Sequence, residues 1–208
     1  RWSPIGLVTG VSTLVQQAFT GPEGASFVNL SQFVSRPEVV SVFFFTHKIA
    51  LIVTLISVLI AYPLAVFMAR RPNLFYLVII LIPLLISIVV RTYGWVVLLG
   101  PRGLLNATLL NLGVIDSPLR LMFNTGGLVV GLVHVFIPFA VLSILAVYVK
   151  IDKSFSEAAM ALGANHWKVF GKITLPLALP GVMTAATIVY LLSLGAIVTP
   201  LLMGGIQQ

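Results

Sequence analysis

The side chains that could do chemistry are few and scattered along the chain. There are 5 acidic residues, 3 histidines and no cysteine. They form no carboxylate pair, no metal-ligand cluster and no activated nucleophile, and no glycine-rich phosphate loop is present. All of the acids lie outside the long apolar runs: Glu23, Glu38, Asp116, Asp152 and Glu157. The sequence therefore predicts a protein that is not an enzyme, with no catalytic residue, no metal site and no cofactor.

The composition is that of a membrane protein. Hydrophobic residues make up 59% of the chain, charged residues 8%, and the mean hydropathy is +1.12, far from the usual soluble range. The net charge of +7 and pI of about 10.2 could suggest nucleic acid. However, the basic residues stand singly or in pairs beside apolar runs rather than in patches. The expected counter-charge is therefore membrane lipid, and no nucleic acid.

The apolar runs predict an all-α, polytopic integral membrane helix bundle. Crossing about 30 Å of hydrocarbon needs about 20 apolar residues, and a helix satisfies its own backbone groups there. Spans are expected at about 46–69, 74–91, 126–149 and 177–199, and the first could begin earlier, at the helix-start pattern Ser35-Arg36-Pro37-Glu38.

The remaining segments are expected to lie outside the hydrocarbon. Residues 1–35 predict a polar lead-in segment, residues 36–208 a transmembrane domain, and residues 93–124 an interfacial loop-helix-loop.

The loop at 150–176 contains signals for two short helices. Ser154 and Glu157 have the spacing of a capping box, which predicts a helix start at Ser154. Gly163 suits the left-handed position just past a helix end. Asn165 could cap a second helix that ends near Lys172, before Pro176 opens the next apolar run.

The same loop carries a longer pattern, E-A-A-x3-G-x9-I-x-L-P. It resembles the cytoplasmic signature of permease subunits in bacterial binding-protein-dependent ABC importers. That resemblance implies the type I importer permease fold, with a coupling-helix loop that docks into a groove of an ATP-hydrolysing partner and transmits its closure to the spans. It further implies two ATP-binding cassette ATPase subunits, which hydrolyse the ATP. The residues that it assigns to ATPase coupling are Glu157, Ala158, Ala159, Gly163, Ile173, Leu175 and Pro176.

Further patterns narrow the resemblance to permeases of the spermidine/putrescine type. They are Ala61-Tyr62-Pro63-Leu64-Ala65, Arg91-Thr92 ahead of Gly103-Leu104-Leu105-Asn106, Leu112-Gly113-Val114-Ile115-Asp116, and Thr199-Pro200 followed by Met203-Gly204-Gly205. The implied setting is a bacterial inner membrane, with a second permease subunit in a heterodimer and a periplasmic substrate-binding protein. The implied solute is spermidine, putrescine or a related amine, amino-acid derivative or opine. The implied core has six spans, so one is expected to be missing at each end here.

The resemblance also sets the orientation. Six basic residues fall on each side of the expected spans, so the count of charges does not decide it. If the signature loop is cytoplasmic, residues 1–35 are a periplasmic lead-in.

Candidate residues for the translocation pathway are Thr184, Thr187, Thr199, Tyr190 and Arg91. Thr184 and Thr187 share a narrow helical face with Gly181. Small residues and threonines also serve close helix packing in membranes, and Arg91 could instead anchor a span at the interface. His134, inside the third span, is expected to be a neutral packing residue.

Two other classes of function compete with an importer permease. An ion-coupled secondary transporter would usually carry carboxylates or paired broken helices within its spans, and neither is evident. A structural membrane subunit would not need a shaped helical loop. The signature loop favours the permease.

Overall fold

The computed structural model describes residues 20–21, 24–25 and 36–196. The chain divides into two compact units, Arg1–Lys48 and Ile49–Gln208, and helix α3 (Pro37–Arg70) runs from the first into the second. In the first unit, β1 (Thr20–Gly21) pairs antiparallel with β2 (Gly24–Ala25). The lead-in expected at 1–35 lies largely outside the described residues, as do the end of the fourth span and the C-terminus.

Helix α3 begins where the helix-start pattern indicated. Pro37 occupies the first helical position, Glu38 lies in the first turn and Arg70 in the last. A proline is tolerated in the first turn because its missing N–H would have no intrahelical partner there. The expected start at about residue 46 was therefore late, and the earlier alternative is confirmed.

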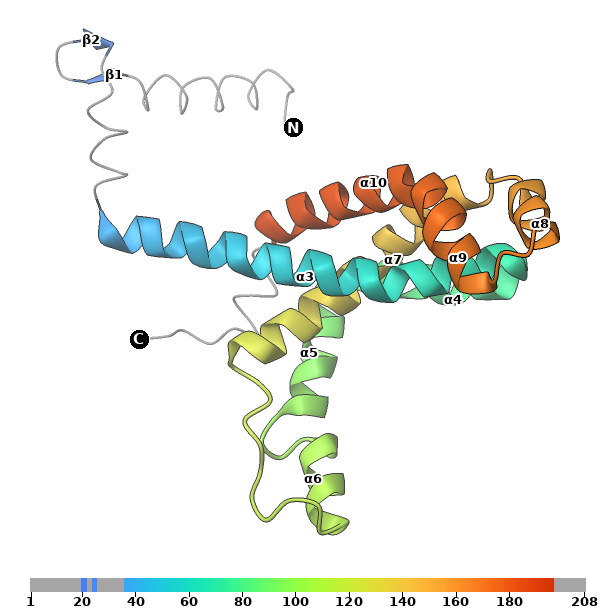
Figure 1. Ribbon diagram of the computed structural model, residues 1–208. Coiled ribbons are helices and arrows are strands. Elements are labelled where there is room, and N and C mark those ends of the chain that lie inside the picture. Colours follow the sequence, from blue (N-terminus) through green and yellow to red (C-terminus); the bar gives the residue numbers. More distant parts are fainter. Residues whose placement is uncertain (1–19, 22–23, 26–35, 197–208) are drawn as a thin grey trace. The chain divides into compact units, whose positions relative to one another are not determined.

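The second unit is helical throughout its described part. After α3 come α4 (Leu74–Leu85), α5 (Ile88–Leu99), α6 (Leu104–Asn111), α7 (Thr125–Tyr148), α8 (Lys153–Ala161), α9 (His166–Val169), the π-helix η1 (Phe170–Thr174) and α10 (Leu175–Leu194). Helix α7 packs against α10, α4 and α5 (Figure 1). It supplies most of the core cluster, together with residues of α3 and α10.

Small side chains bring the helices of this core close together. On α3, Ala50, Ser57, Ala61 and Ala65 are buried at helical spacing. Such residues allow helix backbones to approach closely, which is how helices associate where lipid removes the hydrophobic driving force. The long apolar side chains of α3 lie on its other side and are exposed, among them Leu51, Leu55 and Leu59.

The apolar run at 74–91 is not one helix, so the second expected span is wrong as drawn. Helix α4 ends at Leu85, Ile86 and Ser87 are extended, and α5 begins at Ile88. The helical stretches on the two sides meet at 95°. Arg91 Nη1 donates to the carbonyl oxygen of Pro83 at 2.7 Å, so a carbonyl in the last turn of α4 gains a charged donor in place of the next helical turn.

This break also moves residues 93–99 from an expected loop into α5. Within residues 36–196, three helices are long and apolar enough to cross a membrane, or four if the bent α4–α5 pair is one span. Helix α6 falls within residues 93–124, where a helix between two loops was expected, and the bounds of α7 agree with the helix expected at about 126–149.

One asparagine holds together the segment between α5 and α7. The Asn106 side chain is fully buried and makes three hydrogen bonds. Its Nδ2 donates to the carbonyls of Gly100 and Leu119, both at 3.0 Å, and its Oδ1 accepts from the Leu119 N–H at 2.9 Å. Helix α6 is thereby tied to the turn before it and to the loop after it.

The contact of α7 with α10 depends on a glycine. A Cβ placed on Gly181 would lie 2.9 Å from Val147 Cβ and 3.3 Å from Ile144 Cα. We expect Gly181→Val to destabilise the bundle by about 1–3 kcal/mol, because the backbones of α7 and α10 would have to separate. The measurement is the thermal unfolding midpoint in detergent. Gly94→Val is the matched control, since a Cβ on Gly94 meets nothing within 4 Å; equal midpoints for the two variants would contradict the expectation.

Candidate functional site

The loop that carries the signature pattern folds into the predicted pair of helical segments, but its first cap is a different residue. Asp152 Oδ1 accepts from the Ser154 N–H at 2.9 Å, and α8 begins at Lys153. The capping box expected from Ser154 and Glu157 is therefore wrong. The hydrogen bonds from Ser154 favour the charged carboxylate and lower the pKa of Asp152. The cap consequently persists at neutral pH and weakens only as the pH falls through that lowered value.

Gly163 ends α8 in the predicted left-handed conformation. Its φ is +85°. The Gly163 N–H donates to the Met160 carbonyl at 2.9 Å, and the Ala164 N–H donates to the Ala159 carbonyl at 3.0 Å. These two bonds are those of a Schellman motif, which satisfies the last carbonyls of a helix and reverses the chain.

The second helical segment is capped as expected but does not stop. Asn165 Oδ1 accepts from the Lys168 N–H at 2.9 Å, which starts α9. The expected end near Lys172 is wrong, because α9 passes through η1 directly into α10. Pro176 lies at the second position of α10 but inside this continuous helix, so its missing N–H leaves a carbonyl of the preceding turn without an intrahelical donor. The loop is thus joined to a membrane-length helix, His166–Leu194, with no flexible connection.

The α8–α9 pair exposes large apolar side chains. Leu162 is 89% exposed and Trp167 is 81% exposed, and Phe155 and Met160 are exposed beside them on α8. Four lysines belong to the same loop: Lys150, Lys153, Lys168 and Lys172. We call Phe155, Met160, Leu162 and Trp167 the apolar tip. Large exposed apolar residues on a short capped helix pair that also carries charged residues are typical of a protein-binding surface.

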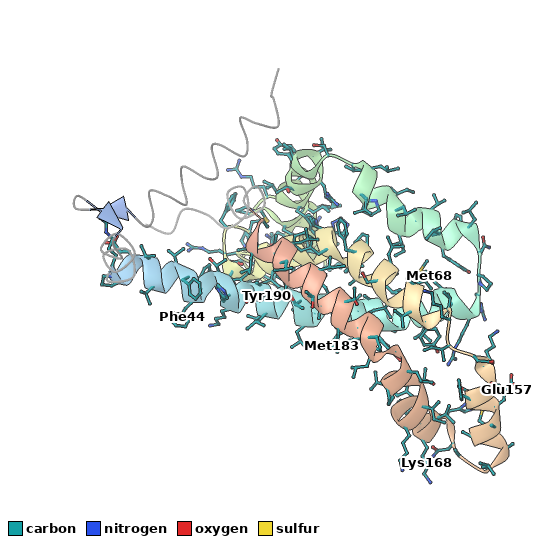
Figure 2. The ribbon with its side chains drawn as sticks, turned by 90° about the horizontal axis from the view of Figure 1, so that it is seen from above. Phe44, Met68, Glu157, Lys168, Met183 and Tyr190 are labelled. Atoms are coloured by element: carbon teal, nitrogen blue, oxygen red, sulfur yellow. The ribbon has the colours of Figure 1, made fainter. Side chains whose placement is uncertain are left out.

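The structure brings the two halves of the signature pattern together. Helix α8, with Glu157, Ala158 and Ala159, contacts both α9 and η1, and η1 contains Ile173. Figure 2 shows Glu157 and Lys168 on the helical segments of this loop, and Met183 and Tyr190 further along α10. Glu157 and Ala158 are exposed, whereas Ile173 and Leu175 are half-buried. The motif residues therefore include both surface positions and positions that fix the pair to α10.

Sequence reasoning missed the most exposed members of this site. The sequence did not assign Trp167 or Leu162 to this site. The sequence feature that could have pointed to them is a tryptophan and a leucine in a loop that also contains four lysines. Neither residue belongs to the signature pattern, so the pattern did not point to them.

The pathway candidates are not brought together. Thr184 and Thr187 are exposed on α10, and each hydroxyl donates to a carbonyl of its own helix, Pro180 or Met183, at 2.9 Å. Gly181 is buried against α7, whereas the two threonines are exposed. The three residues that were expected to share one face therefore lie in two different environments. Tyr190 is half-buried on the same helix, and Thr199 lies outside the described residues.

Arg91 lies at the α4–α5 break, near a second polar contact. Trp95 Nε1 donates to His134 Nδ1 at 3.2 Å, and the two rings meet edge to face. A histidine that accepts at Nδ1 carries its proton on Nε2 and is neutral. This geometry agrees with the expectation that His134 is a neutral packing residue, and it gives Trp95 a specific partner.

The fold is that of a membrane protein whose long apolar helices are joined by an exposed pair of short helices. The family model described as "Binding-protein-dependent transport system inner membrane component" matches residues 51–208. The spermidine/putrescine transport system permease protein PotB of Escherichia coli K12 is 34% identical over 206 residues, covering 94% of this chain and 74% of the relative. PotB of Haemophilus influenzae is 35% identical over 159 residues, covering 74% of this chain and 55% of the relative.

Solved structures show the same fold. A bacterial ABC transporter involved in the import of the acidic polysaccharide alginate matches with a TM-score of 0.62 at 20% identity, covering 88% of this chain and 66% of that chain. At this identity the match supports the fold alone.

The chain belongs to the family of binding-protein-dependent transport system inner membrane components. It is a permease subunit of the ABC importer type, as the signature loop predicted.

Proposed function

We propose that the chain forms part of the membrane pathway of an ATP-driven importer and that the α8–α9 pair is its docking element for an ATPase subunit. The observation that supports this most directly is the apolar tip on a helix pair that continues without a break into α10. A surface of this kind binds a partner, and the continuous helix passes movement of the pair to the membrane helices. ATP is hydrolysed on the partner, in two copies, and a second permease completes the pathway as a heterodimer.

The solute that we propose is a polyamine such as spermidine or putrescine, or a related amine. The support is that the PotB relatives are permease proteins of spermidine/putrescine transport systems. A polycation needs carboxylates or aromatic faces to replace its water. Because every acid of this chain lies outside the apolar core of its membrane-length helices, we assign solute recognition chiefly to the periplasmic binding protein and the second permease.

The pathway assignment is a narrower proposal. Thr184 and Thr187 face away from the core of this chain, so they are available to line a path shared with the second permease. Thr199, Tyr190 and Arg91 remain candidates on the sequence resemblance alone.

The docking proposal is tested by removing the apolar tip. We expect Leu162→Ala with Trp167→Ala to reduce co-purification of the ATPase more than tenfold, because a few large apolar anchors supply most of the energy of an interface. Membrane insertion should be unchanged, since both side chains are exposed. The control is Leu112→Ala, also an exposed leucine at 70% but placed after α6. Full retention of the ATPase by the double variant would refute the docking role.

The orientation is tested with single cysteines, which are unique labels because the chain has none of its own. Lys168→Cys and Arg71→Cys should resist impermeant thiol reagents added outside the cell, whereas Asn111→Cys should react. This follows from placing the ATPase-docking loop in the cytoplasm and from counting the bent α4–α5 pair as one span, so that the chain crosses the membrane twice between Arg71 and the α8–α9 pair. Labelling of Lys168→Cys from outside would exclude an ATPase-docking role.

A further inference from the structure

The helix that joins the docking pair to the membrane contains a π turn at Phe170–Thr174. The Leu175 N–H donates to the Phe170 carbonyl, five residues back rather than four. A π turn is a one-residue insertion in an α-helix; such turns are rare and are frequently found at functional sites. Here it lies between the docking surface and the first turn of α10.

Burial on the two sides of the turn shows what the insertion does. Val169, before the turn, and Thr174, at its end, are both buried. From Thr174 onward the buried positions follow α-helical spacing: Ala178, Gly181, Ala185 and Val189. Residues five apart in a regular α-helix point about 140° away from each other. The wider π turn brings Val169 onto the same side as the buried face of α10.

The turn also presents an aromatic ring to another helix. Phe170 meets the Tyr62 ring of α3 edge to face, with ring centroids 5.8 Å apart. Tyr62 belongs to the Ala61–Ala65 pattern, and Ala61 and Ala65 on either side of it are buried in the core. Among the described residues the Tyr62 hydroxyl has no hydrogen-bond partner. Tyr62 therefore contacts the π turn through its ring and not through its hydroxyl.

We propose that the π turn fixes the rotational register between the docking pair and α10, and that the contact of Phe170 with Tyr62 transmits movement of the docking pair to α3. This inference rests on the proposed docking function. It makes Tyr62 a positioning residue for coupling: it touches neither the solute nor ATP, and it connects α3 to the segment that the ATPase moves.

The contact is tested with two variants of Tyr62 in the assembled importer. Tyr62→Leu should lower solute uptake per ATP hydrolysed about three- to tenfold, the range expected when a two-state element loses one aromatic pair. Tyr62→Phe should match the wild type because it keeps the ring. ATPase co-purification should be unchanged in both. Equal coupling ratios in Tyr62→Leu and the wild type would overturn the transmission role.

The register is tested by changing the number of residues in the turn. Deletion of Gly171 shortens the five-residue spacing to four and converts the π turn to α, so Val169 and Thr174 stay on one side; coupling should remain within about threefold of wild type. Insertion of one alanine after Gly171 turns the docking pair by about 100° relative to α10 and should lower coupling more than tenfold. Gly171→Ala is the control for composition, since a Cβ there meets nothing within 4 Å.

These results separate the two proposals. Equal coupling in the deletion and the insertion variants, whether both high or both low, would overturn the register role. If the insertion variant fails to accumulate, the Tyr62 pair still decides the transmission role. Failure of the docking proposal would appear differently: the wild-type chain would retain no ATPase and show no ATP-dependent uptake.

Discussion

Replacing Gly163 by valine is expected to lower transport more than tenfold while the chain still inserts into the membrane. The residue has φ +85°, and an added Cβ would meet nothing within 4 Å. The cost is therefore conformational and not steric: a β-branched residue held in the left-handed region destabilises the folded loop by about 1–3 kcal/mol. The Schellman bonds at Met160 and Ala159 would be given up first, and α8 would no longer be held against α9.

The measurement is uptake together with ATPase co-purification. Gly113→Val is the matched control, because Gly113 also has a left-handed φ, +66°, and open space around it, but follows α6. Both variants should lose a similar amount of local stability, and only Gly163→Val should lose the ATPase. Gly163→Asn should keep part of the activity, since asparagine tolerates this conformation. Normal transport by Gly163→Val would contradict the claim that transport requires the geometry that Gly163 sets between α8 and α9.

The helix pair could be predicted from sequence because its determinants are local. A cap, a left-handed glycine and a second cap each act over about four residues. Two local expectations were wrong: the identity of the first cap and the end of the second helix near Lys172. Asp152 and Ser154 both fit a helix start in this sequence, and the choice between them depends on backbone conformation that the residue types do not fix.

The break between α4 and α5 could not be predicted, because it depends on a contact across it. Residues 74–90 carry no charge, and a proline alone often kinks a membrane helix without ending it. The break is completed by Arg91, whose guanidinium reaches the Pro83 carbonyl. A hydropathy profile averages residue types along the chain. It does not tell which carbonyl an arginine side chain will contact.

The threonine face shows a different limit. Helical periodicity places Gly181, Thr184 and Thr187 within one arc, but it does not tell which edge of the arc meets α7. The structure puts Gly181 against Val147 and leaves both threonines exposed. The π turn was not predicted, because the second helix of the loop was expected to end near Lys172. In the structure the buried residues Val169 and Thr174 are five apart, and the helix continues through them into α10.

Replacing Asn106 by leucine is expected to unfold the segment between α5 and α7. Leucine is close in size but offers no polar atom, so the Leu119 N–H would lose its acceptor, while the Gly100 and Leu119 carbonyls would each keep only a backbone donor, the Gly103 or the Leu121 N–H. Leaving that N–H unsatisfied costs about 1–3 kcal/mol, and losing each of the two carbonyl bonds costs about 0.5–1.5 kcal/mol, which together are enough to release one loop. Asn106→Asp should be nearly as damaging, because it keeps the acceptor for the Leu119 N–H but places a carboxylate oxygen against two carbonyl oxygens.

Thr108→Ala is the control, since the Thr108 hydroxyl bonds only the Leu104 carbonyl of its own exposed helix turn. The measurement is limited proteolysis of residues 100–124 in the folded protein, together with hydrogen exchange at the Leu119 amide. Wild-type protection of that amide in Asn106→Leu would mean that the loop is held by something other than this side chain.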